Sequence, residues 1–102
     1  MNEENRTKLK AVMKFYGYEN QREIFVEECA EAIQAVQKLK RADNCTQIKQ
    51  AYDNLKEEIA DVIITTEQMK LFISSDKEIE EIIAKKLERQ IDRMGKQGGS
   101  DD

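Results

Sequence analysis

The 102-residue sequence contains no histidine, no proline and no tryptophan. Without histidine, the chain cannot form a Ser-His-Asp or Cys-His catalytic arrangement, a His-ligated zinc site or the Glu-x-x-His pattern of a ferritin-like di-iron oxidase. Any general base or metal ligand must therefore be a carboxylate, a lysine, a tyrosine or a cysteine.

Glycine is also scarce, because one of the four glycines is Gly17 and the other three lie at position 95 or beyond. Glycine and proline are the usual residues of tight turns, so a long interior without either predicts helices joined by short polar turns. Apolar residues recur at helical spacing, and Gly17, Asn20 and the Ser75–Glu78 pair supply end signals. We predict an all-α, four-helix bundle-like fold, with one helical domain over 1–94, helices at 3–16, 21–41, 47–72 and 76–94, and a flexible tail over 95–102.

Cysteine and charge limit the chain further. Cys29 and Cys45 form no metal-binding or disulfide pattern, so we interpret both as reduced structural thiols. The formal net charge of −4 disfavours nucleic acid or an anionic membrane as the main partner. The sequence begins without an apolar leader, and no apolar run approaches the roughly 18–20 residues of a membrane span. We therefore expect a soluble, cytoplasmic protein.

Four carboxylates break the amphipathic pattern of the two central helices. At about 100° per residue, Glu28 falls within the apolar stripe of the second helix, and Glu31 lies at its edge. Glu58 and Asp61 occupy the same places on the third helix. If the two helices pack through their stripes, all four carboxylates converge.

Such a convergence is costly unless a positive charge compensates it. Lys49 and Lys56 face away from the third helix's stripe, so a divalent metal is the natural compensator. An all-oxygen set favours Mg²⁺, with Mn²⁺ as an alternative. Either acidic pair alone would be read as a solvated helix face, but two pairs on facing stripes favour a metal site.

At these residues the sequence resembles the MazG-like, all-α nucleoside triphosphate pyrophosphohydrolases. Their Glu-Glu-x-x-Glu and Glu-x-x-Asp signatures correspond to Glu27–Glu31 and Glu58–Asp61, with similar flanks in Tyr16–Gln21 and Ile59–Val62. A later Lys-Leu-Glu-Arg at 86–89 is similar to the family's Lys-Phe-x-Arg, although Lys85 stands where many members carry Asn. The resemblance covers residues 16–93.

The resemblance implies a Mg²⁺-dependent hydrolase that cleaves an NTP or dNTP between the α- and β-phosphates, for housecleaning of the nucleotide pool. Carried over by position, Glu28, Glu31, Glu58 and Asp61 would ligate the metal, and Glu27 would orient or activate the attacking water. Lys86 and Arg89 would bind the substrate phosphates, with Lys85 or Arg93 as further contacts. Basic residues near the end of a helix also complement its dipole, which is the competing interpretation.

Other parts of the sequence leave alternatives open. Phe15, Tyr16, Tyr18 and Gln21 are candidates for contacting the base, although packing is the better interpretation for the aromatic residues. A phosphoribosyl-ATP pyrophosphohydrolase is a related alternative, but its second motif is usually followed by Tyr-His, which is absent here. A non-catalytic helical interaction module is the alternative from another class. Phe25, Ile64 and Phe72 remain as surplus apolar residues and suggest a homodimer or homotetramer.

Overall fold

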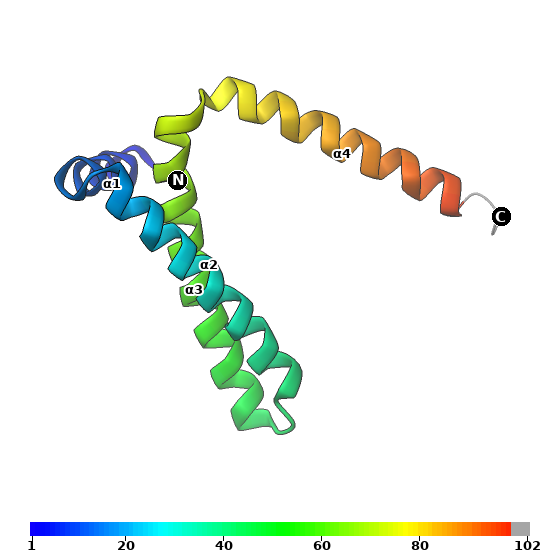
Figure 1. Cartoon of the computed structure of the whole chain (residues 1–102). Coiled ribbons are helices and arrows are strands. Elements are labelled where there is room, and N and C mark those ends of the chain that lie inside the picture. The colour runs from blue at the N-terminus through cyan, green and yellow to red at the C-terminus, as the bar shows by residue number, and fades with distance from the viewer. Residues whose placement is uncertain (99–102) are drawn as a thin grey trace. The chain divides into compact units, whose positions relative to one another are not determined.

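A computed structural model describes residues 1–98, and these residues form four helices and no strand. The helices are α1 (Glu3–Tyr16), α2 (Tyr18–Arg41), α3 (Cys45–Ile73) and α4 (Asp76–Gly98). The all-α prediction is confirmed (Figure 1). The chain forms two compact units, one over Met1–Phe72 and one that begins at Ile73 and contains α4. None of the described helices is long and apolar enough to cross a membrane.

Gly17 alone connects α1 to α2. Its φ of 87° and ψ of 161° are accessible only to glycine, and its N–H donates to the Met13 carbonyl at 2.8 Å, closing α1. Its own carbonyl accepts from the N–H of Gln21 at 3.1 Å, which opens α2. The helix therefore begins at Tyr18 rather than at residue 21, and the predicted cap at Asn20 is wrong. Asn20 lies inside the first turn and donates to the Gln21 side chain instead.

Polar side chains close the other helix starts. Asn44 accepts from the N–H of Gln47 at 2.9 Å, so it caps α3, which begins two residues earlier than predicted. Ser75 accepts from the N–H of Glu78 at 3.3 Å, as the sequence predicts for a cap. The Glu78 carboxylate, however, accepts from the hydroxyl of Ser74 at 2.7 Å.

Helix α4 continues through residues 95–98, where the sequence analysis expected a flexible tail to have begun. One glycine inside a helix costs only about 1 kcal/mol relative to alanine, and the good helix formers Lys96 and Gln97 follow Gly95. The rest of the predicted tail, residues 99–102, lies outside the described residues.

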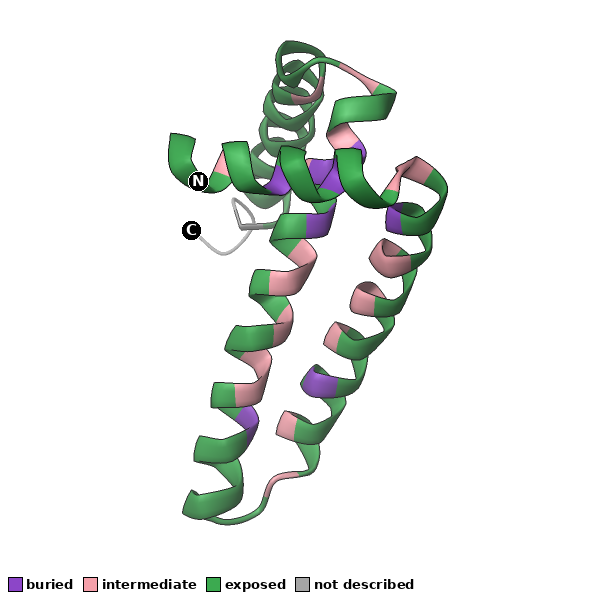
Figure 2. Cartoon of the chain, turned by 90° about the vertical axis from the view of Figure 1, so that its left-hand side faces the viewer, coloured by how far each residue is buried: buried purple, intermediate pink, exposed green. Residues whose placement is uncertain are grey.

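The first unit is an antiparallel α2–α3 hairpin whose open end is crossed by α1 (Figures 1 and 2). Buried residues gather where α1 crosses the hairpin (Figure 2). The buried apolar side chains include Leu9 and Met13 of α1 and Met69 of α3. Nearer the α2–α3 turn, the buried apolar side chains are the small ones of Ala35 and Ala51.

A buried amide pair joins the helices at this end. Gln21 of α2 donates from Nε2 to Gln68 Oε1 of α3 at 3.0 Å, and Gln68 Nε2 donates to the Leu9 carbonyl of α1 at 3.2 Å. Only 1% of Gln68 and 5% of Gln21 is exposed. Buried amides are stable only when paired, so this network fixes the register of all three helices.

We expect Gly17→Ala to lower the free energy of unfolding by about 1–3 kcal/mol, because a Cβ is disfavoured at this φ and ψ. The matched control is Gly95→Ala, in a helical position where a Cβ meets nothing within 4 Å. That substitution should leave stability unchanged or raise it by up to about 1 kcal/mol. Urea unfolding followed by circular dichroism compares the two, and equal effects would contradict the role given to Gly17.

Candidate metal centre

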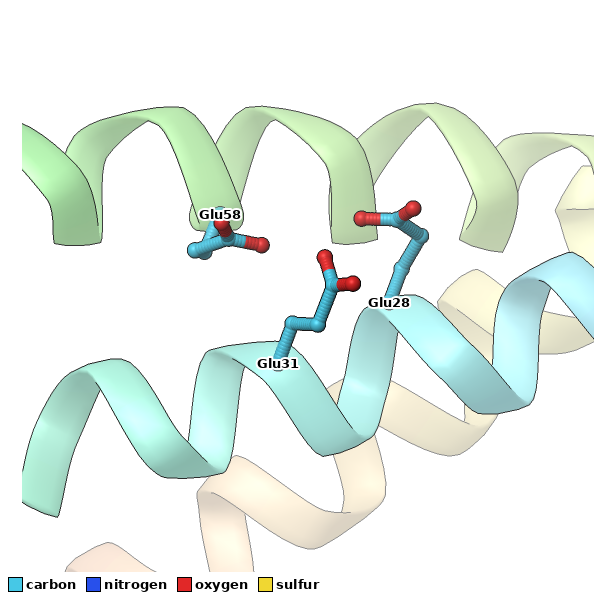
Figure 3. A group of neighbouring side chains, drawn as sticks. All are labelled: Glu28, Glu31 and Glu58. Atoms are coloured by element: carbon cyan, nitrogen blue, oxygen red, sulfur yellow. The ribbon is translucent and has the colours of Figure 1, made fainter.

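Three of the four predicted carboxylates meet between α2 and α3. Glu28 and Glu31 extend from α2 and Glu58 extends from α3, each towards the others (Figure 3). One carboxylate oxygen from each residue lies within 4.8 Å of the other two. An i, i+3 spacing places the two α2 residues on one face of their helix, and the hairpin brings Glu58 opposite them.

Asp61 is one turn from Glu58 on α3 but is not part of this group of three. It lies beside Glu28, and the two carboxylates line the same cavity. The structure therefore brings together all four predicted metal ligands, three in a tight cluster and the fourth next to Glu28.

The cluster raises the pKa of its half-buried members. The pKa of Glu28 rises from 4.5 to about 7, first because burial disfavours the charged form, and then because Asp61, Glu31 and Glu58 are negative. The pKa of Glu58 is raised as well, again mainly by burial and next by the charge of Glu31. Within residues 1–98, none of the ion pairs involves any of the four carboxylates.

Two oxygen atoms in the cluster have no hydrogen-bond partner, Oε2 of Glu28 and Oε2 of Glu58, and both are buried. Buried acceptors are nearly always satisfied, so these two atoms are free to accept from a proton or to ligate a cation. Oxygens on opposite sides of a divalent ion lie about 4.2 Å apart for Mg²⁺ and about 4.8 Å apart for Ca²⁺. The upper limit of 4.8 Å on the oxygen separations and the all-oxygen donor set are compatible with a hard divalent cation.

A cavity of about 440 Å³ opens beside Glu28 and Asp61, between α1, α2 and α3. Most of its wall surface is apolar, and its polar groups include the amides of Gln21 and Gln68, the carboxylates of Glu28 and Asp61 and the ammonium group of Lys8. They are formed by Met1, Asn5, Lys8, Leu9, Val12, Gln21, Ile24, Glu28, Asp61, Ile64, Thr65 and Gln68. Small-molecule sites have this size and this mixture of apolar walls and few polar groups.

Other predicted residues lie elsewhere. Glu27 is exposed on α2 and is not one of the three clustered carboxylates. Lys86 and Arg89 are exposed on α4, in the second unit, so their contact with substrate phosphates stays a prediction. Lys85 and Arg93 are exposed on the same helix.

Of the residues predicted to contact the base, one lines the cavity and the others do not. Gln21 lines the cavity, whereas Phe15 is 81% exposed and, like Tyr16, is not part of its wall. Tyr18 packs against Phe72, with ring centroids 4.7 Å apart, which agrees with the packing interpretation.

Sequence reasoning missed Thr65 and Gln68 of α3, which line the cavity beside Asp61. The hydroxyl of Thr65 donates to the Asp61 carbonyl at 2.9 Å, and Gln68 holds the amide network. A signal was present, because polar residues continue from Asp61 at i+4 and i+7 along one edge of the apolar stripe.

Comparison of the chain with protein-family models, curated proteins and solved structures gave no significant match. The geometry of the cluster and of its cavity thus carries the functional argument.

The raised pKa of Glu28 makes stability depend on pH. Between pH 4.5 and about 7 the folded state binds more protons at this site than the unfolded chain does, so the free energy of unfolding falls as pH rises. Glu28→Gln should remove this loss, because glutamine does not titrate. In EDTA, the free energy of unfolding of the variant relative to that of wild type should therefore be higher at pH 8 than at pH 5 by on the order of 1 kcal/mol. Urea unfolding at both pH values measures the gain. Glu27→Gln, at an exposed neighbour, is the control, and a wild-type pH dependence in Glu28→Gln would contradict the assignment.

Proposed function

We propose that the protein is a Mg²⁺-dependent nucleotide pyrophosphohydrolase that converts an NTP or dNTP to the monophosphate and pyrophosphate. The observation that carries this proposal is the cluster of Glu28, Glu31 and Glu58, which has two buried oxygens without a hydrogen-bond partner and no ion pair to a basic residue among residues 1–98. A cluster of this kind without a ligand would lower the stability of the fold, because its carboxylates repel one another. A phosphate-binding cation would compensate this repulsion. The MazG-like sequence signature at the same residues supports the same reaction.

The chain's own groups have distinct parts in this proposal. Glu28, Glu31 and Glu58 would hold the cation, and Asp61, beside Glu28, would be the fourth ligand. Bound Mg²⁺, with Mn²⁺ as an alternative, supplies neutralisation of the phosphate oxygens and polarisation of water. The resemblance to the MazG-like enzymes assigns to Glu27, which is exposed and outside the cluster, the role of orienting the attacking water or accepting a proton from it. Lys86 and Arg89 are proposed to bind the phosphates.

The cavity beside Glu28 and Asp61 supports a substrate that has a phosphate chain at one end and a flat, partly apolar group at the other. Its volume of about 440 Å³ falls within the range of small-molecule sites. Gln21 and Gln68 offer amide groups at its wall, and Leu9 and Val12 offer apolar surface. We assign the nucleoside part of the substrate to this cavity.

A second candidate function is a non-catalytic helical interaction module. The observation in its favour is the number of large apolar side chains that are exposed on α2, α3 and α4. It leaves the unpartnered oxygens of Glu28 and Glu58 unexplained, so we rank it second.

The reaction is tested by release of pyrophosphate and nucleoside monophosphate from a panel of NTPs and dNTPs, with Mg²⁺ and with EDTA. We expect metal-dependent turnover, reduced about 100-fold or more in Glu31→Ala and Asp61→Ala with helicity retained. Glu23→Ala, at an exposed carboxylate of α2 outside the cluster, is the matched control and should retain activity. Inactivity on every nucleotide, with no Mg²⁺-induced rise in Tm, would favour the interaction module.

The cavity assignment is tested by filling it. Val12→Phe should raise KM about tenfold with little change in kcat, because it removes room for a part of the substrate that does not react. Phe15→Ala, three residues along α1 and outside the cavity wall, should leave both constants unchanged. If instead Phe15→Ala raised KM and Val12→Phe did not, the base would be bound by Phe15 and not in the cavity.

A further inference from the structure

A second cavity lies at the closed end of the hairpin, beside the turn that joins α2 to α3 (Figure 1). Its volume is about 350 Å³, and it shares no residue with the cavity beside Glu28. We call it the turn cavity. Its wall contains five side chains with N–H groups, which are Lys38 and Arg41 of α2 and Gln47, Gln50 and Asn54 of α3.

No carboxylate lines the turn cavity. Its other two wall residues are Ala42 and Ala51, so the wall has two positive charges and no negative one. The chain as a whole has 21 acidic and 17 basic residues, and the cavity beside Glu28 has two carboxylates and one lysine in its wall. The turn cavity is therefore positive in a chain that is otherwise negative.

The two basic side chains of the wall are not paired with acidic ones. Among residues 1–98, neither Lys38 nor Arg41 belongs to an ion pair. Asp53 precedes a wall residue in the sequence, but its carboxylate is paired with Lys49 at 2.8 Å and with Lys56 at 3.8 Å. Both positive charges of the wall are thus available to an anion.

The amides on the α3 side of the cavity have donors to spare. Oε1 of Gln47 accepts from the backbone N–H of Asp43 at 3.2 Å, so the group that remains free is Nε2, which can only donate. Within residues 1–98, no hydrogen bond holds the side chains of Gln50 and Asn54. Each of these two amides can therefore turn its NH₂ group towards a ligand.

The carboxylate cluster is too distant to neutralise the wall. Lys38 follows Glu31 by seven residues, which is two helical turns, so the two residues are about 10 Å apart along α2. The screening length at physiological ionic strength is about 8 Å, so the charge of Glu31 is largely screened at Lys38.

The chemistry of the wall fits a phosphate group. A phosphate monoester carries a charge of about −1.5 to −2 at pH 7, which matches the two positive charges, and its three terminal oxygens accept from several donors at once. The guanidinium of Arg41 can bind two of these oxygens, whereas Lys38 acts as a point charge. The volume lies near the lower end of the range for small-molecule sites, and the net charge of −4 disfavours a nucleic acid.

We propose that the turn cavity binds the phosphate group of a small molecule, either inorganic phosphate or a phosphomonoester. Lys38 and Arg41 neutralise the phosphate, and the amides of Gln47, Gln50 and Asn54 donate to its oxygens. This site is separate from the carboxylate cluster, and it does not depend on the proposed hydrolysis of nucleotides.

An NMR titration of the isotope-labelled full chain in EDTA tests the proposal, because EDTA removes any cation through which phosphate could bind the carboxylates. Inorganic phosphate and glycerol phosphate are added separately at constant ionic strength. We expect saturable shifts of the backbone amide signals centred on residues 38–54. Tighter binding of glycerol phosphate would identify a phosphomonoester as the ligand, and tighter binding of inorganic phosphate would identify the free anion.

Substitutions then test the wall itself. Lys38→Gln and Arg41→Gln should each raise the dissociation constant about tenfold, because each removes a charge-assisted hydrogen bond. Lys40→Gln is the matched control, since Lys40 lies in the same last turn of α2 but does not line the cavity, and it should leave the dissociation constant unchanged. Circular dichroism checks helicity, and Arg41→Lys replaces Arg41→Gln if the latter does not fold. It keeps the charge but loses the planar fork, so it should bind phosphate less tightly than wild type.

Three outcomes would overturn the proposal. Equal weakening in Lys40→Gln would mean that the general charge at the end of α2 attracts phosphate. Shifts confined to residues outside the turn would place phosphate elsewhere, and the absence of saturable shifts would leave the basic residues only the role of complementing the dipole of α2. The titration contains neither a cation nor a nucleotide, so its result is separate from that of the turnover assay.

Discussion

The arrangement of the first unit depends on an electrostatic conflict between α2 and α3. Glu28, Glu31 and Glu58 meet where an ordinary hairpin would place apolar side chains, and no basic residue among the described residues neutralises them. Burial and mutual repulsion raise the pKa of Glu28 and of Glu58. Such a site is stable only if it holds protons or a cation.

The α1 helix forms one wall of the cavity beside the acidic cluster. It crosses the open end of the hairpin, and the Gln21–Gln68 pair, bonded to the Leu9 carbonyl, fixes its position. Between α1 and the hairpin lies the cavity that Glu28 and Asp61 border. The acidic cluster and the cavity are thus adjacent in one unit, and Gly17 allows the sharp reversal that places α1 there.

The hairpin is also divided between two kinds of surface. Small alanines allow α2 and α3 to approach closely, so the carboxylates can meet across the gap, and the larger residues turn outward.

The sequence by itself determined the all-α fold and the place of the four carboxylates on their helices, because helical periodicity acts through neighbours three and four residues apart. It also located the Ser75 cap and the glycine between α1 and α2. It did not determine the start of α2, because the conformation of Gly17 replaced the cap expected at Asn20. Only the tertiary structure decided that Asp61 stands beside the cluster rather than within it and that Thr65 and Gln68 line a cavity. Each of these depends on how separate helices approach one another, which periodicity along a single helix does not specify.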